Sequence, residues 1–174
     1  MQAQSASQML AISASSRAMQ SGPDLSAVPA KVAAWTVAMS VKVNADARRI
    51  SQALTEPEYL EAWIRIPDQA PGASLVASND ANGFRLEHHC AGCIDMRITG
   101  SYLFRHQRKM RLAWRKARTT TAADSIVDFR LRGDFGCSIL ELRHTAFNSA
   151  DEFHWHHRLW QGSLPKLASL LRSA

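Results

Sequence analysis

The sequence predicts an α+β fold in which a curved antiparallel sheet carries one long C-terminal helix across its concave face. Three observations lead to this expectation. Residues 35–43 alternate strictly between apolar and polar types, later segments repeat that alternation, and the last part of the chain repeats apolar residues at helical spacing. A half-apolar sheet needs a cover on its inner face, and the final helix can supply it.

Two short helices are expected directly after the first strand. Asp46 can cap the first of them, which carries Ala47, Ile50 and Leu54 on one side. Residues 55–58 (TEPE) fit a capping box at the start of the second, in which Thr55 and Glu58 satisfy free amide groups. The second helix should turn Leu60, Trp63 and Ile64 inward and end before Pro67.

A series of strands follows, separated by turn residues. Alternation predicts strands near residues 75–78, 84–89, 95–100, 110–115, 127–132 and 140–144. Ala91 and Gly92 have the character of a two-residue hairpin turn. Several half-apolar antiparallel strands at this spacing indicate one sheet.

The long helix is expected over residues 151–172. Ser149 is a suitable cap, and Pro165, which lacks a backbone donor, is expected to kink the helix. Its apolar face is made of Phe153, His157, Trp160, Leu164, Leu167 and Leu171.

Composition limits the class of protein. The 174 residues include 46% apolar and 21% charged types, which excludes disorder throughout, and no uncharged apolar run approaches the roughly 18 residues of a membrane span. Three cysteines are too few for a disulfide scaffold. Residues 1–34 are rich in Ala, Ser and Gln, without the pattern of a secretory signal. We therefore expect a flexible extension over 1–34, a domain over 35–174, and a cytoplasmic location.

The order of elements resembles the helix-grip superfamily of START domains, birch-pollen-type allergens and polyketide cyclases. Within it, the chain is most similar to the branch of the carboxy-terminal domain of the activator of the heat-shock chaperone ATPase. The segments that carry the resemblance are 45–58 (ADARRISQALTEPE), 99–102 (TGSY), 112–114 (LAW), 140–147 (LELRHTAF) and 160–167 (WQGSLPKL). A shared fold is weak evidence for a shared activity.

The resemblance implies a cavity between the sheet and the long helix that binds a small hydrophobic or amphipathic molecule. Inward His88, His144 and His157 would orient the ligand. Taken singly, each apolar lining residue and each inward histidine is more often an ordinary core residue than a ligand-binding one. The expected ligand-binding residues are Trp63, Phe84, Leu86, His88, Ile98, Leu112, Trp114, Phe129, Leu142, His144, His157, Trp160 and Leu164.

Two other classes of function remain open. One is an interaction protein that regulates a chaperone-type ATPase, and the other is a cyclase-like or hydrolase-like enzyme that uses inward histidines. The sequence has no G-x-S-x-G, phosphate-binding glycine loop or H-E-x-x-H motif, so a binding protein is the preferred interpretation and no cofactor is expected.

Two local motifs have ordinary explanations. Cys90 and Cys93 flank the predicted hairpin turn, and this C-x-x-C is interpreted first as incidental, then as a redox pair, and last as part of a zinc site, so no metal is expected. The basic residues between Arg105 and Arg118 fall partly on the face opposite Leu112 and Trp114. They are interpreted as the solvated back of the sheet, without nucleic-acid binding.

Overall fold

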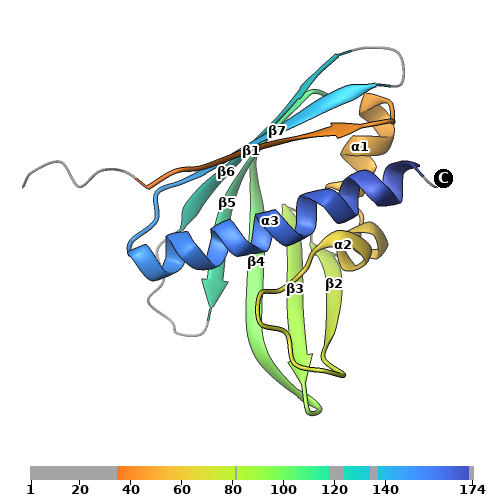
Figure 1. Cartoon of the computed structure of the whole chain (residues 1–174). Helices are drawn as coiled ribbons and strands as arrows, with labels where there is room; N and C mark the ends of the chain where they lie inside the picture. The colour runs from red at the N-terminus through yellow and green to blue at the C-terminus, as the bar shows by residue number, and fades with distance from the viewer. Residues whose placement is uncertain (1–34, 81, 118–123, 134–136, 173–174) are drawn as a thin grey trace, which may run out of the picture. The chain divides into compact units, whose positions relative to one another are not determined.

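The structure is a computed structural model, and it describes residues 35–80, 82–117, 124–133 and 137–172. The extension expected over residues 1–34 lies outside the described residues. In the described part, the chain forms seven strands and three helices (Figure 1). In order these are β1 (Val37–Val43), α1 (Ala47–Ala53), α2 (Pro57–Trp63), β2 (Ser74–Asp80), β3 (Gly83–Cys90), β4 (Cys93–His106), β5 (Lys109–Ala117), β6 (Ser125–Arg132), β7 (Ser138–Thr145) and α3 (Ala150–Arg172).

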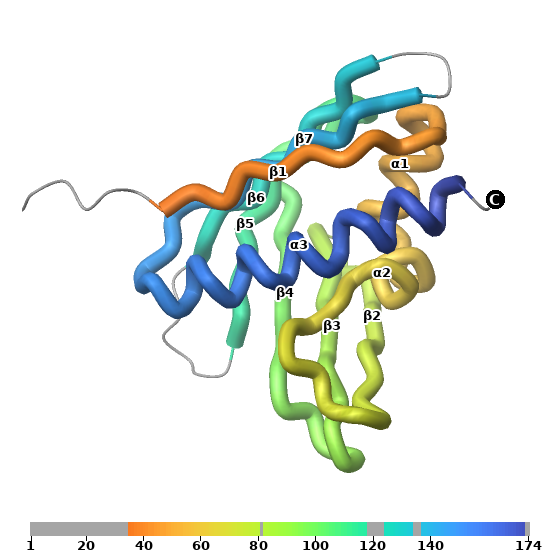
Figure 2. Tube along the Cα trace, in the orientation of Figure 1, coloured from red at the N-terminus to blue at the C-terminus, as the bar shows by residue number. Residues whose placement is uncertain are grey.

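All seven strands belong to one antiparallel sheet with the order β1-β7-β6-β5-β4-β3-β2. The helices α1 and α2 carry the chain from β1 at one edge of the sheet to β2 at the other, as the continuous trace in Figure 2 shows. The long helix α3 lies across the concave face (Figure 1). The predicted α+β architecture is therefore confirmed.

Register places the apolar members of neighbouring strands side by side on the face that α3 covers. One row across the sheet pairs Met39 with Leu142, Leu142 with Phe129, and Phe129 with Met110. Their chain neighbours point to the opposite face, so the core forms on one side of the sheet only. None of the helices within the described ranges is both long and apolar enough to cross a membrane.

Most helix starts agree with the sequence, and one does not. The side chain of Asp46 accepts a hydrogen bond from the Arg49 amide at 2.8 Å, which confirms it as a cap. The capping box predicted at Thr55 is wrong, because Pro57 occupies the first turn of α2 and Glu56 takes the cap position without a side-chain bond. The Thr55 hydroxyl instead donates to the Ser51 carbonyl at 2.9 Å.

The start of α3 carries a reciprocal pair of capping bonds. The hydroxyl of Ser149 accepts from the Glu152 amide at 3.2 Å, and the Glu152 carboxylate accepts from the Asn148 amide at 2.9 Å. The helix continues through Pro165, which lies on its exposed side. Water can therefore reach the backbone carbonyl that this proline leaves without a donor.

The absence of a side chain at Gly100 leaves the space that the Phe84 ring occupies. A Cβ atom added at Gly100 would meet the ring of Phe84, which is buried and also contacts Trp114 edge-on with ring centroids 5.8 Å apart. The missing side chain on β4 therefore allows the aromatic packing of β3 and β5.

We predict that Gly100→Ala lowers the free energy of unfolding by about 1–3 kcal/mol, because the Phe84 ring must move within a packed core. Gly162→Ala is the control: that site is exposed on α3, its Cβ would lie 3.6 Å from the Arg65 Cβ, and alanine favours helix. Urea unfolding of both variants checks this. A Gly100→Ala protein as stable as the unmodified chain would contradict the account.

Candidate functional site between the sheet and the long helix

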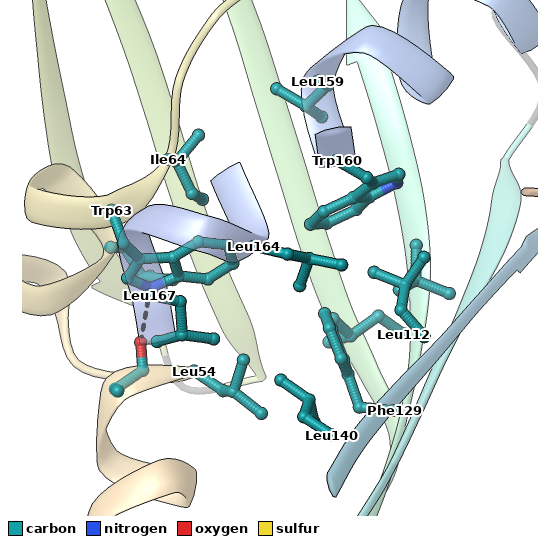
Figure 3. Close-up of a cluster of buried hydrophobic side chains, with 14 of the residues drawn as sticks. Leu54, Trp63, Ile64, Leu112, Phe129, Leu140, Leu159, Trp160, Leu164 and Leu167 are labelled. Carbon is teal, nitrogen blue, oxygen red and sulfur yellow. Dashed lines mark hydrogen bonds between the residues drawn. The ribbon is translucent and has the colours of Figure 1, made fainter. Parts of the chain in front are cut away.

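An aromatic cluster fills the space between the sheet and α3. The Trp160 ring lies 5.2 Å from that of Trp114, 5.8 Å from Phe129 and 6.4 Å from Trp63, centroid to centroid. Figure 3 shows the side chains of α2, α3 and the strands pointing toward one another, with the Trp63 indole bonded to the Ala53 carbonyl at 2.8 Å. Trp160 is the residue of α3 that touches most of these rings.

The residues expected to line a chamber are packed against one another. Of the thirteen, all except His157 expose 4% or less of their surface. A chamber wide enough for water would leave accessible surface on its walls. These side chains therefore occupy the expected cavity in this structure, because three indoles and two phenyl rings supply enough volume to fill it. That these residues bind a ligand stays a prediction.

His144 lies at the centre of a continuous chain of hydrogen bonds. The Trp160 indole donates to His144 Nδ1 at 2.9 Å, so this nitrogen carries no proton and the ring proton lies on Nε2. Nε2 donates to the Ser125 hydroxyl at 2.7 Å, and that hydroxyl donates to the Trp114 carbonyl at 3.0 Å. Every polar atom of the imidazole is satisfied.

Burial, and secondarily the neighbouring His156, lowers the pKa of His144 to about 2. His144 is therefore neutral at physiological pH, with both ring nitrogens engaged. This arrangement gives no support to the idea that His144 serves an enzyme as acid or base. It links β7, β6 and α3.

The expectation that His157 points inward is wrong: His157 is exposed, and its neighbour His156 is buried. His157 and His156 lie three and four residues before Trp160, and both spacings are compatible with the same face of a helix. The rotation of α3 about its axis turns His156 inward and leaves His157 exposed. His156 Nδ1 donates to the Glu152 carbonyl at 2.7 Å. Its ring lies 4.6 Å from that of His144. Burial is the main cause that lowers the pKa of His156, to about 4, and the charge of Lys116 adds to it.

His88 points inward as expected and is held by a carboxylate. Its Nδ1 lies 2.6 Å from Asp95 Oδ1, and the ring is buried while the Asp95 side chain is partly exposed. The ladder between β3 and β4 shifts register just after His88. Such an irregularity changes the direction of neighbouring side chains. Asp95 was not among the residues that the sequence predicts for the site.

Three buried polar atoms on the inner face lack a hydrogen-bond partner among the described residues: Trp114 Nε1, His156 Nε2 and His88 Nε2. The first two belong to rings packed against His144, and His88 lies farther toward the β3–β4 hairpin. Lys116 lies near this end, with its Nζ 3.9 Å from the centre of the Trp155 ring.

The other end of the interior is apolar, so the inner face changes from polar side chains near His144 to apolar side chains at the opposite end. The apolar end is formed by Val43, Leu54, Leu140, Leu167 and Leu171.

The hairpin at Cys90 and Cys93 forms as predicted. The two cysteines are direct cross-strand partners around Ala91 and Gly92, whose φ angles of 51° and 80° match the two-residue turns of hairpins. The cysteines are free. Within the described ranges no three His, Cys, Asp or Glu side chains come together to hold a metal. Redox pairing stays a hypothesis.

The basic stretch lies partly on the outer face, where carboxylates neutralise some of it. Arg111 bonds Asp128 at 2.7 Å and Arg115 bonds Asp124 at 2.7 Å, and these contacts raise the pKa of both arginines. Paired, exposed arginines on a sheet are consistent with the solvated back that was expected.

No protein-family model matches the chain, and no curated protein matches its sequence. Solved structures do. Protein CV1439 from Chromobacterium violaceum is 21% identical, with a TM-score of 0.64 over 78% of this chain and 96% of that one. CalU16 from Micromonospora echinospora is 18% identical, with a TM-score of 0.56 over 79% of this chain and 76% of that one. Aha1 from Colwellia psychrerythraea, solved as a dimer, is 14% identical, with a TM-score of 0.56 over 78% and 95%.

These similarities support the helix-grip-like fold that the sequence motifs implied. At such low identity they concern the fold alone, and membership of the chaperone-activator branch stays a prediction. The sequence reasoning missed Ser125 and His156, which complete the polar part of the interior. Ser125 offered little signal because serine commonly begins a strand after a loop.

We predict that the free energy of unfolding falls as the pH drops from 7 to 5. His144 and His156 have folded pKa values of about 2 and about 4, below the ordinary 6.5, so the unfolded chain binds more protons in this range. Each histidine accounts for about 2 kcal/mol of the loss. The stability is fully present above pH 6.5 and is lost as the pH falls toward the folded values.

Urea unfolding of two neighbouring variants separates this effect from the carboxylates. His156→Gln should remove about half of the histidine-dependent loss, whereas His157→Gln, at an exposed position, should keep it. Identical pH dependence of His156→Gln and the unmodified chain would contradict the assignment.

Proposed function

We propose that the chain binds a small amphipathic molecule between the sheet and α3. The observation that carries the proposal is the pair of unpartnered buried atoms beside His144, a donor at Trp114 Nε1 and an acceptor at His156 Nε2. A buried polar atom without a partner costs about 1–3 kcal/mol. A ligand that accepts a hydrogen bond from Trp114 and donates one to His156 would remove that cost.

A hydroxyl group is the simplest ligand group with both capacities, since it accepts and donates. The remainder of the ligand would lie toward the apolar end of the interior, among Trp63, Phe129 and Leu167. Its transfer from water would contribute about 25 cal/mol per Å² of apolar surface buried. The polarity of the interior therefore favours a molecule with one hydroxylated end and an apolar, preferably aromatic, body.

Because the aromatic side chains fill the interior, binding requires α3 to move away from the sheet or from the segment that follows α2. The apolar packing of α3 would have to yield, together with several polar contacts of the described residues. The Ser163 hydroxyl accepts from the Arg65 amide at 2.9 Å, Arg158 pairs with Asp68 at 3.0 Å, and Trp160 bonds His144. We therefore expect slow association, limited by this opening.

A protein partner is the second candidate. Leu103 and Phe104 near the end of β4 expose 56% and 49% of their surface. They lie beyond Ser101, the last residue of β4 in the ladder with β3. Large exposed apolar side chains on a strand with one uncovered edge are suited to a protein contact. The similarity to Aha1 is compatible with this alternative and with ligand binding alike.

Native mass spectrometry of the chain purified from its own source tests the two candidates. A co-purifying small molecule at one copy per chain supports the interior site. A chain that carries no small molecule and instead holds a chaperone-type ATPase would overturn the ligand proposal in favour of the second candidate.

We predict that 1-naphthol binds more tightly than naphthalene, because only 1-naphthol carries the hydroxyl for Trp114 and His156. The expected advantage is on the order of tenfold or more in Kd, because the hydroxyl gains two hydrogen bonds of about 0.5–1.5 kcal/mol each. Quenching of the tryptophan fluorescence measures both affinities.

The variant Trp114→Phe should lose most of this advantage, whereas Trp35→Phe, outside the aromatic cluster, should retain it. Equal affinity of the two probes for the unmodified chain would contradict the polar site. Failure of both probes to bind would contradict the interior site as a whole.

A further inference from the structure

A groove of about 450 Å³ lies on the outer face of the sheet, opposite α3. Its lining consists mainly of outward-facing residues of β1, β7, β6 and β5, and the inward-facing Met39 and Leu142 also border it. Ala38 and Ser40 on β1 are short, while the side chains beside them on β7 and β6 are long, and this difference in length makes the hollow. The groove is separate from the interior site, because successive residues of a strand point to opposite faces.

The charges of the groove are unevenly paired. Asp128 accepts two bonds from Arg111, at 2.7 and 3.0 Å, and Glu141 pairs with Arg132 at 2.9 Å. Register sets Asp128 directly opposite Arg143, and Glu141 directly opposite Arg130. Both carboxylates are therefore engaged by other arginines. Three arginines (Arg111, Arg130 and Arg143) and both carboxylates line the groove, which gives the lining a charge of 3 − 2 = +1. Arg132 pairs with Glu141 from outside the lining.

Arg130 and Arg143 are the arginines left over. Neither guanidinium group forms a hydrogen bond or ion pair in the part of the chain that the structure describes, and both residues are exposed. They occupy diagonal positions on the neighbouring strands β6 and β7. Side chains in that relation have Cβ atoms about 7–8 Å apart, within reach of one shared partner for residues as long as arginine.

A phosphate group matches this arrangement. It carries up to two negative charges and several acceptor oxygens, and guanidinium groups bind such oxygens in pairs. The Ser40 hydroxyl lines the same groove and can donate to a further oxygen. The remaining volume is ample for an organic group attached to the phosphate, since small-molecule sites measure about 300–1,000 Å³.

We propose that this outer groove binds a small organic phosphate monoester, with the phosphate between Arg130 and Arg143 and the organic group over Ala38 and Ser40. The site requires no opening of the fold, because the groove is already present. It is independent of the interior site, so either site can exist without the other.

Phenyl phosphate and inorganic phosphate are the probes, added to the full ¹⁵N-labelled chain at constant ionic strength. The expected result is a saturable shift of the backbone amide signals of Ala38, Ser40 and Arg143, with tighter binding of phenyl phosphate. The double variant Arg130→Gln, Arg143→Gln should weaken binding on the order of tenfold or more, the value of charge-assisted bonds.

A charge-matched control separates the site from general attraction to a basic protein. Arg48 and Arg85 are exposed, lie outside the groove and have no ion-pair partner in the described ranges. The double variant Arg48→Gln, Arg85→Gln should bind phenyl phosphate as the unmodified chain does. Equal weakening by the two double variants, or shifts centred elsewhere, would overturn the proposal.

Two further outcomes would also overturn it. Equal affinity for inorganic phosphate and phenyl phosphate would show that the groove does not bind the organic group of a phosphate monoester. Co-sedimentation with phosphatidylserine vesicles that depends on Arg130 and Arg143, without binding of phenyl phosphate, would assign the face to an anionic membrane surface instead.

Discussion

The hydrogen bond from the Trp160 indole to His144 determines how α3 lies on the sheet. Apolar packing is not directional, so many rotations of a leucine-rich helix could bury similar areas. A buried indole N–H without an acceptor costs about 1–3 kcal/mol, and Trp160 avoids this cost by donating to Nδ1 of His144 on the sheet. This bond defines the rotation of α3 and with it the choice of His156 over His157 as the inward histidine.

The same bond explains why the interior is polar at one end and closed. It holds Trp160 among Trp63, Trp114 and Phe129, and these rings occupy the space that a bound molecule would need. The polar atoms without partners lie beside this link. A molecule that enters must therefore displace aromatic side chains, and it would gain hydrogen bonds that the closed interior does not make. The outer groove differs in both respects, because it is open and its free polar groups are charged.

Much of the fold was predictable from the sequence because strand alternation depends only on which side chains avoid water. The alternation of residues 35–43 and of the later segments predicted the sheet, and the turn residues Ala91 and Gly92 predicted a hairpin that the structure contains. The long helix and its cap at Ser149 followed from spacing and residue type.

The site was less predictable because it depends on quantities that periodicity does not contain. The rotation of α3 decides between two adjacent histidines, and the total volume of the aromatic side chains decides whether a chamber stays open. The start of α2 shows the same limit on a small scale: Pro57 takes the first helical position and moves the cap to Glu56, although Thr55 has the better capping side chain. The outer groove depends on which arginine reaches each carboxylate, and register alone suggests the wrong partners.

The most direct test of the central claim is nitrogen-15 NMR of the His144 ring followed from pH 7 to pH 4. The account predicts a single neutral form throughout, with the proton on Nε2 and none on Nδ1, because Trp160 donates to Nδ1 and burial keeps the pKa of the ring at about 2. A proton on Nδ1 at neutral pH, or titration near the ordinary value of 6.5, would show that Trp160 does not hold α3 through this imidazole.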